Sequence, residues 1–196
     1  MADEDTLRFY AQNASDYALH RLLPTGEMLS AFLARLPKGG KILELGCGNG
    51  VDAAFMLSEG FDVDATDGTP ALAAEASRRI GRSVRVLRFE QLESVQIYDG
   101  VWAAASLLHV PAADLTDVLR RIHTAIRPGG HFTASYKGGT GEGRDDLGRY
   151  YNYPTVAQLA TAYHRAGWLE VGVESRSGSG FDGQLTEWHW VSAQRR

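Results

Sequence analysis

Cysteine is almost absent from this 196-residue chain, which contains only Cys47. A single cysteine excludes an internal disulfide and is typical of proteins in a reducing compartment, so we expect a cytoplasmic location. No apolar run approaches the roughly 18–20 residues of a membrane-spanning helix. The acidic start, Met1 to Asp5, lacks the apolar segment of a signal peptide. We predict no metal site.

An excess of positive charge is also missing. Twenty Lys and Arg residues stand against 24 Asp and Glu residues, which gives a net charge of -4 and a pI near 5.9. This balance argues against general binding to nucleic acid or to an anionic membrane. The length and the 44% apolar content suit one globular domain over 1–196. We expect a monomer or homodimer whose partner is a small-molecule substrate.

Glycine, in contrast, is concentrated at one informative place. The apolar segment 41–45 runs into Gly46, Gly48 and Gly50, and an amphipathic segment follows at once. This pattern predicts a buried strand, a tight turn and a helix N-terminus, where backbone can approach a ligand closely. The dinucleotide motif G-x-G-x-x-G needs its third glycine at Val51, and Glu44 is poorly suited to a pyrophosphate. An NAD-dependent oxidoreductase is therefore disfavoured.

Strand and helix patterns alternate along the rest of the chain. Helical segments are predicted at 6–36 with a break near Pro24, and at 51–58, 70–80, 111–127 and 155–166. Strands are predicted at 41–45, 61–65, 84–87, 99–105, 131–135, 169–175 and 186–193. Such alternation is typical of an α/β domain built from βαβ units on a parallel sheet.

The stretch Glu44-Leu-Gly-Cys-Gly-Asn-Gly50 resembles motif I of class I S-adenosylmethionine-dependent methyltransferases. The number and order of elements are similar to that family, and so is the turn Arg127-Pro-Gly-Gly130. The resemblance implies a Rossmann-like seven-stranded sheet, mostly parallel with the last strand antiparallel, and helices on both faces. It also implies a helical lid at 1–38, a core at 39–196, and S-adenosylhomocysteine as product.

The resemblance assigns cofactor contacts to the ends of the first two strands. Gly46, Cys47 and Gly48 would approach the methionine part, and Glu44 would face its amino group. Asp67 would accept hydrogen bonds from the ribose hydroxyls and Gly68 would let the ribose approach. For Asp67 the alternative is a helix cap, a position that Thr69 fits better.

Later strand ends supply further candidates. The family often has an acid for the adenine amino group where this chain has Arg88, so Phe89 and Glu90 are the expected substitutes. Ser106 should line the cofactor and acceptor pockets, and Tyr17 belongs to a lid-like segment. His109 has the chemistry of a general base, with a structural role as the alternative.

The glycine-rich loop 136–153 is the candidate acceptor site. It concentrates Lys137, Arg144, Arg149 and Tyr150, which would suit a carboxylate or oxyanion. A solvated hairpin is the alternative, and Trp188 and Trp190 are expected to be packing residues.

We therefore predict methyl transfer from S-adenosylmethionine to a small molecule, in a small bacterial single-domain subgroup that includes tellurite-resistance-like methyltransferases. The alternatives are a tellurite- or chalcogen-directed enzyme, or a protein that binds the cofactor without transferring its methyl group. The sequence leaves the acceptor and its accepting atom open.

Overall fold

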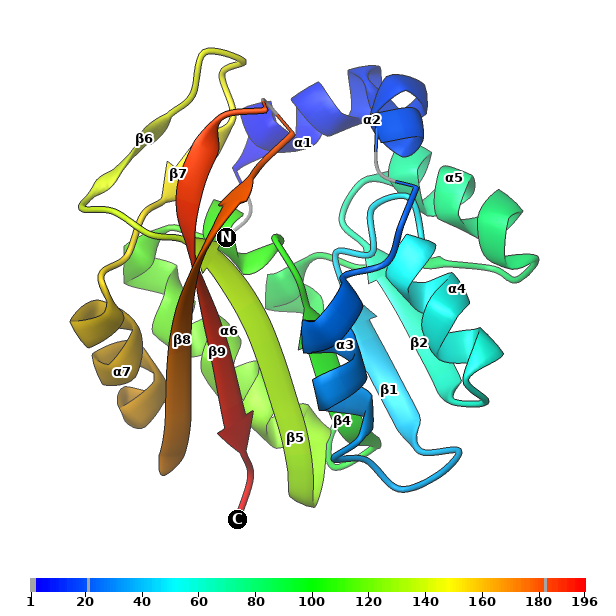
Figure 1. Ribbon diagram of the computed structural model, residues 1–196, viewed down its shortest axis with the longest axis vertical. Coiled ribbons are helices and arrows are strands. Elements are labelled where there is room, and N and C mark those ends of the chain that lie inside the picture. Colours follow the sequence, from blue (N-terminus) through cyan, green and yellow to red (C-terminus); the bar gives the residue numbers. More distant parts are fainter. Residues whose placement is uncertain (1–2, 21, 182) are drawn as a thin grey trace.

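The computed structural model describes residues 3–20, 22–181 and 183–196. In it, helices pack on both faces of a twisted, mostly parallel sheet (Figure 1). The sheet strands are β1 (Lys41–Leu45), β2 (Asp62–Asp67), β3 (Arg85–Val86), β4 (Tyr98–Ala103), β5 (Ile126–Lys137), β8 (Glu170–Ser179) and β9 (Leu185–Gln194). Their order is β3-β2-β1-β4-β5-β9-β8. β9 runs antiparallel to both of its neighbours, β5 and β8, while the other pairs are parallel. The predicted Rossmann-like sheet with an antiparallel last strand is confirmed.

The helices follow the predicted pattern closely. They are α1 (Glu4–Gln12), α2 (Ala14–His20), α3 (Gly26–Leu33), α4 (Val51–Ser58), α5 (Pro70–Ile80), α6 (Ala112–Ala125) and α7 (Val156–Arg165), with short 3-10 turns at Phe89–Gln91 and Leu107–His109. Pro70 occupies the first turn of α5, where its missing N–H costs no hydrogen bond. Thr155 caps α7 by accepting a hydrogen bond from Gln158. Among the described helices, none is long and apolar enough to cross a membrane.

The loop 136–153 contains a small hairpin, the form that the sequence offered as the alternative to an acceptor-binding loop. β6 (Glu142–Arg144) pairs antiparallel with β7 (Tyr150–Asn152). Asp145 organises its turn by accepting the backbone N–H groups of Leu147 and Arg149. A carboxylate that bonds backbone two residues ahead is a local turn device, so the loop is more ordered than its glycine content suggests.

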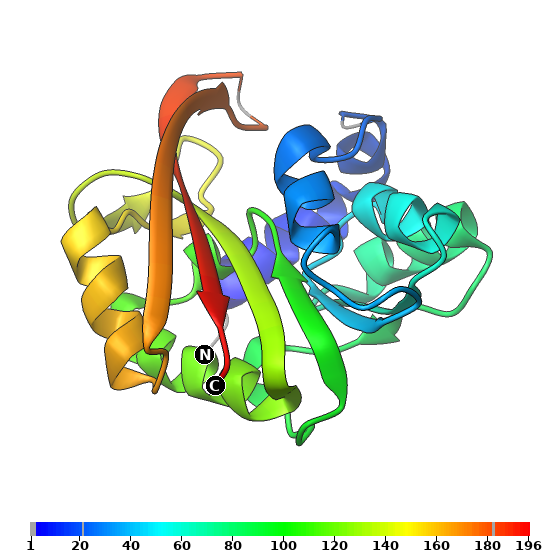
Figure 2. The same cartoon turned by 60° about the horizontal axis from the view of Figure 1, so that its bottom comes forward.

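Two apolar layers enclose the sheet. On one face, α6 and α7 bury residues such as Leu119 and Tyr163 in the larger cluster. On the other face, Phe32 of α3, Met56 of α4 and Trp102 of β4 form a second cluster. Figure 2, turned from the first view, shows the β8–β9 hairpin extending beyond the body of the sheet. The carboxyl ends of β1, β2 and β4 meet at the edge of the sheet that α1 and α2 cover.

Candidate active site

The glycine turn after β1 is held in place by the neighbouring strand. The N–H groups of Gly46 and Cys47 both donate to the carbonyl of Thr66, at 2.9 Å each. Gly46 has φ of 75° and Gly48 has φ of 57°, a region that favours glycine. A Cβ at Gly46 would lie 2.5 Å from the Cβ of Ser106, so glycine is needed there for close packing against the end of β4.

The same turn holds the helical segment that covers it. Asn49 donates from its amide to the carbonyl of Ala18 at 3.0 Å, and Arg79 donates to the carbonyl of Asn49 at 2.8 Å. These bonds fix α2 over the turn, and the ring of Tyr17 lies 3.2 Å from where a Cβ of Gly48 would stand. Tyr17 is thereby placed directly on the glycine turn.

Asp67, at the end of β2, joins this turn through both carboxylate oxygens. Oδ2 accepts the N–H of Gly48 at 2.9 Å and Oδ1 accepts the N–H of Thr69 at 2.8 Å. The side chain is 6% exposed. Burial raises the pKa of Asp67 to about 6, against the opposing effect of these two hydrogen bonds. Thr69 holds the N-cap position of α5 but makes no side-chain cap bond.

These elements enclose a first cavity with about 600 Å³ of space between protein atoms, part of it open to solvent. The predicted site residues that line it are Tyr17, Gly46, Gly48, Asp67, Gly68, Phe89, Ser106 and His109. Its apolar lining includes Leu7, Leu72 and Leu87 together with Phe89. A flat base fits such an apolar slot better than a charged group does.

Three predicted cofactor residues do not line the first cavity. Glu44 is buried at the end of β1, and Cys47 is buried behind the turn, where burial raises the pKa of its thiol. Glu90 follows Phe89 in the 3-10 turn and is not among the residues that line the cavity. Arg88, in place of the family's usual acid, forms an ion pair with Glu4 of α1 at 2.6 Å. The cation thus joins α1 to the loop that follows β3.

His109 lies where the first cavity meets the β6–β7 hairpin. Its Nδ1 is 2.6 Å from the carbonyl of Tyr150, which only accepts hydrogen bonds, so Nδ1 carries the proton. Nε2, 3.0 Å from the hydroxyl of Tyr10, is then the acceptor of that O–H. Burial lowers the pKa of His109 to about 4, with Arg149 adding to the effect. The imidazole is therefore neutral and fixed in one tautomer near pH 7.

Arg149 is a buried structural cation. Its side chain is 1% exposed, and its guanidinium pairs with Asp145 at 2.6 Å. The guanidinium also lies over the rings of Phe9, Tyr151 and Phe181, with 5.2–5.3 Å to each ring centroid. Cation–π contacts of this kind join α1, the β6–β7 hairpin and the loop between β8 and β9.

The other predicted acceptor residues are likewise engaged within the protein. Arg144 donates to both oxygens of Asp3, at 2.9 and 2.8 Å, and Tyr150 donates to Glu142. Lys137 is buried, with its ammonium 4.7 Å from the ring centroid of Tyr151. None of Lys137, Arg144, Arg149 and Tyr150 lines the first cavity or the second one described below. Their part in acceptor binding stays a prediction.

A second, larger cavity lies between the N-terminal helices and the β8–β9 hairpin. It has about 1310 Å³ of space between protein atoms, part of it open to solvent, and its wall includes Trp188, Trp190, Phe181 and Ser135. The two tryptophans were expected to be packing residues, and both do pack against the core, Trp190 with its ring centroid 5.6 Å from that of Trp102. Both also line this cavity. The signal that could have identified them is their spacing of two, which places both indoles on one face of β9.

Tyr17 and Ala105 line both cavities and form the partition between them. Ala105, just after β4, has φ of 51°, which is uncommon for a residue with a Cβ. Its N–H donates to the hydroxyl of Ser135 at 2.8 Å, a bond that helps to hold this conformation. Strained backbone of this kind clusters at functional sites.

Comparison with known proteins identifies the family. A model of the methyltransferase domain matches residues 16–172, and the chain therefore belongs to that family. It is 34% identical to ubiquinone biosynthesis O-methyltransferase of Xanthomonas axonopodis pv. citri over 131 residues, which is 63% of this chain and 53% of that protein. The chain spans about half the length of that relative and less of others, such as the same enzyme of Vibrio vulnificus.

Solved structures show the same fold. 1,6-Didemethyltoxoflavin-N1-methyltransferase of Burkholderia thailandensis, with 1,6-didemethyltoxoflavin and S-adenosylhomocysteine bound, has a TM-score of 0.74 and 24% identity. The match covers 98% of this chain and 87% of that one. Phosphoethanolamine N-methyltransferase 2 of Haemonchus contortus has a TM-score of 0.76 and 17% identity. The match covers 95% of this chain and 59% of that one. The predicted class I methyltransferase architecture is confirmed, while the tellurite-resistance-like subgroup stays a prediction.

Proposed function

We propose that this chain transfers a methyl group from S-adenosylmethionine, held in the first cavity, to a small molecule held in the second. The observation that carries the proposal is the shared partition: Tyr17 and Ala105 face both cavities. A group transfer between two ligands needs their reacting atoms within about 3–3.5 Å. Two cavities that share one wall make such an approach possible.

The residues of the first cavity fit the cofactor. Asp67 is buried, faces the cavity and keeps lone pairs for two ribose hydroxyls beyond those used by Gly48 and Thr69. The left-handed glycines bring backbone rather than side chains to the cavity wall. Leu72, Leu87 and Phe89 form an apolar slot for the adenine. Glu90 is not needed for this fit, although its predicted adenine contact is untested.

When bound, the cofactor supplies a methyl group on a positively charged sulfur, and the leaving group is S-adenosylhomocysteine, whose sulfur is neutral. The chain's own contribution is to align the two ligands and to exclude water. α1 and α2 cover the first cavity, and the ion pairs of Asp3 with Arg144 and of Glu4 with Arg88 hold α1 in place. His109, neutral and accepting from Tyr10, holds that ring in the wall of the first cavity.

The names of similar proteins support a small acceptor with an oxygen or nitrogen nucleophile. An O-methyltransferase of ubiquinone biosynthesis and an N1-methyltransferase of 1,6-didemethyltoxoflavin are both among them. We propose the same general class of acceptor for this chain. An acceptor with a carboxylate or oxyanion, held by Lys137 and Arg149, is the less favoured proposal, because both side chains already have partners.

Calorimetry with S-adenosylmethionine, S-adenosylhomocysteine and NAD tests the cofactor. We expect the first two to bind and NAD not to bind; the reverse result would overturn the proposal. Formation of S-adenosylhomocysteine with a library of phenols and heteroaromatic bases tests transfer. Cofactor binding with no product from any acceptor would instead favour a protein that binds the cofactor without transferring its methyl group.

A further inference from the structure

The second cavity is walled by aromatic rings from several elements. Trp188 and Trp190 project from the same face of β9. Across the cavity, Phe181 at the tip of the β8–β9 hairpin packs against Tyr17 of α2, with 5.2 Å between ring centroids. Both tryptophans are partly exposed although they are among the largest apolar side chains. Rings that are left uncovered around one space are typical of a site for a flat apolar ligand.

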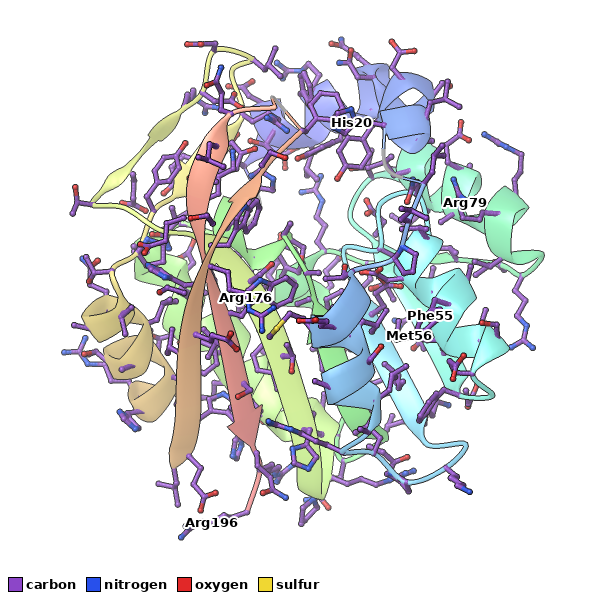
Figure 3. The ribbon with its side chains drawn as sticks, in the orientation of Figure 1. His20, Phe55, Met56, Arg79, Arg176 and Arg196 are labelled. Atoms are coloured by element: carbon purple, nitrogen blue, oxygen red, sulfur yellow. The ribbon has the colours of Figure 1, made fainter. Side chains whose placement is uncertain are left out.

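The charged side chains of this wall neutralise one another. Arg176 of β8 forms ion pairs with Glu27 of α3 at 3.1 Å and with Glu174 at 2.6 Å. Figure 3 labels Arg176, which projects from β8 toward α3, and His20, which lies near the hairpin tip. An anionic ligand would have to displace two carboxylates from one guanidinium. The wall therefore favours an uncharged ligand.

One polar group lies beside the partition. The oxygen of Ser135 accepts the N–H of Ala105 at 2.8 Å, and both residues line the second cavity. No hydrogen bond among the described residues uses the hydroxyl proton of Ser135. That proton is thus suited to a ring oxygen or ring nitrogen that points toward the partition.

We propose that the methyl acceptor is an uncharged, planar aromatic or heteroaromatic molecule. It stacks on Trp188 and Trp190 and directs an oxygen or nitrogen toward Ser135 and the partition. The inference rests on the proposed function, since it takes the second cavity to be the acceptor site. It goes further by excluding aliphatic and carboxylate acceptors.

Binding to the protein saturated with S-adenosylhomocysteine tests this inference without requiring turnover. The planar probes are 2-naphthol and quinoline, and the non-planar and anionic controls are cyclohexanol and decanoate, all measured by calorimetry. We expect the planar probes to bind at least about tenfold more tightly than the controls. Trp188→Leu and Trp190→Leu should each lower the affinity for 2-naphthol by about tenfold, because each removes one stacking partner.

Matched variants separate stacking from folding. Trp190→Phe keeps a ring and should restore most of the affinity, and Leu169→Ala, exposed and remote from both cavities, should change nothing. Equal binding of decanoate and 2-naphthol, absence of 2-naphthol binding, or unchanged affinity in both leucine variants would each overturn the inference. Failure of S-adenosylhomocysteine itself to bind would instead overturn the proposed function.

Discussion

The carboxylate of Asp67 accepts a hydrogen bond from the backbone N–H of Gly48 at 2.9 Å, which joins the ends of β1 and β2 in the wall of the first cavity. Asp67→Asn replaces one acceptor oxygen by a donor, which cannot pair with a backbone N–H. We expect the affinity for S-adenosylmethionine to fall by about 1–3 kcal/mol, as for loss of charge-assisted bonds. Calorimetry measures this loss. Asp62→Asn, at the exposed far end of the same strand, is the control and should leave the affinity unchanged.

Cofactor affinity should also depend on pH. Burial raises the pKa of Asp67 to about 6 in the free protein. Ribose hydroxyls donate to the ionised carboxylate and therefore lower its pKa, so binding releases a proton below about pH 6. Affinity should rise from pH 5 to about pH 6 and then level off. Calorimetry at pH 5.5 in two buffers of different ionisation enthalpy detects the released proton. A cofactor affinity that does not change with pH, or that changes equally in Asp67→Asn, would refute Asp67 as the group that binds the ribose.

Much of this site was predictable because motif residues lie at strand ends. Parallel strands bring Gly46, Asp67 and Ser106 to one edge of the sheet, so sequence order alone predicts that they meet. The acceptor side was not predictable in this way. From the sequence Arg149 was a loop cation available to an acceptor, but it pairs with Asp145 four residues away and lies over the rings of Phe9 and Phe181 from distant segments. Such pairing depends on tertiary packing, which a single sequence does not reveal.

Gly46 should be intolerant of a side chain even in the absence of ligand. An alanine there would be strained at φ of 75° and would place its Cβ 2.5 Å from that of Ser106. Together these effects should lower the free energy of unfolding by about 2–5 kcal/mol. Gly81→Ala, with a similar φ of 66° and open space around it, should cost only the backbone strain, about 1–2 kcal/mol.

A double-mutant cycle isolates the contact at Gly46. Ser106→Gly removes the Cβ that an alanine at position 46 would meet, so the two substitutions together should cost less than the sum of their separate effects. The expected coupling is about 1–3 kcal/mol, measured by chemical denaturation. Strict additivity would show that the turn relaxes away from the end of β4.

Arg149→Met should destabilise the fold strongly. The substitution leaves Asp145, whose side chain is 12% exposed, without its cation. Removal of one partner of a buried ion pair costs about 3–5 kcal/mol. Asp145→Asn in the same chain should recover part of that loss, because no buried charge then remains. Arg120→Met, which breaks an exposed pair with Asp117, should change the free energy of unfolding by less than about 1 kcal/mol.

His109 should make the fold sensitive to mild acid. Burial lowers its pKa from 6.5 to about 4, so the unfolded chain binds more protons than the folded one between these values. Its contribution to stability is present above about pH 6.5 and is lost as the pH falls toward 4. His109→Gln keeps a polar side chain without this titration. The thermal midpoint of the variant should therefore fall less between pH 7 and pH 5 than that of the unsubstituted protein.

The raised pKa of Asp67 acts in the opposite direction, since protonation of a buried carboxylate favours the folded state as the pH falls. That contribution is common to both proteins and cancels when the two midpoints are compared. An equal fall in the variant would mean that His109 is not held neutral by burial. The same neutrality predicts that kcat/KM shows no inflection near pH 6.5 from His109. An inflection there that disappears in His109→Gln would instead identify the imidazole as a titrating base that Tyr10 does not shield.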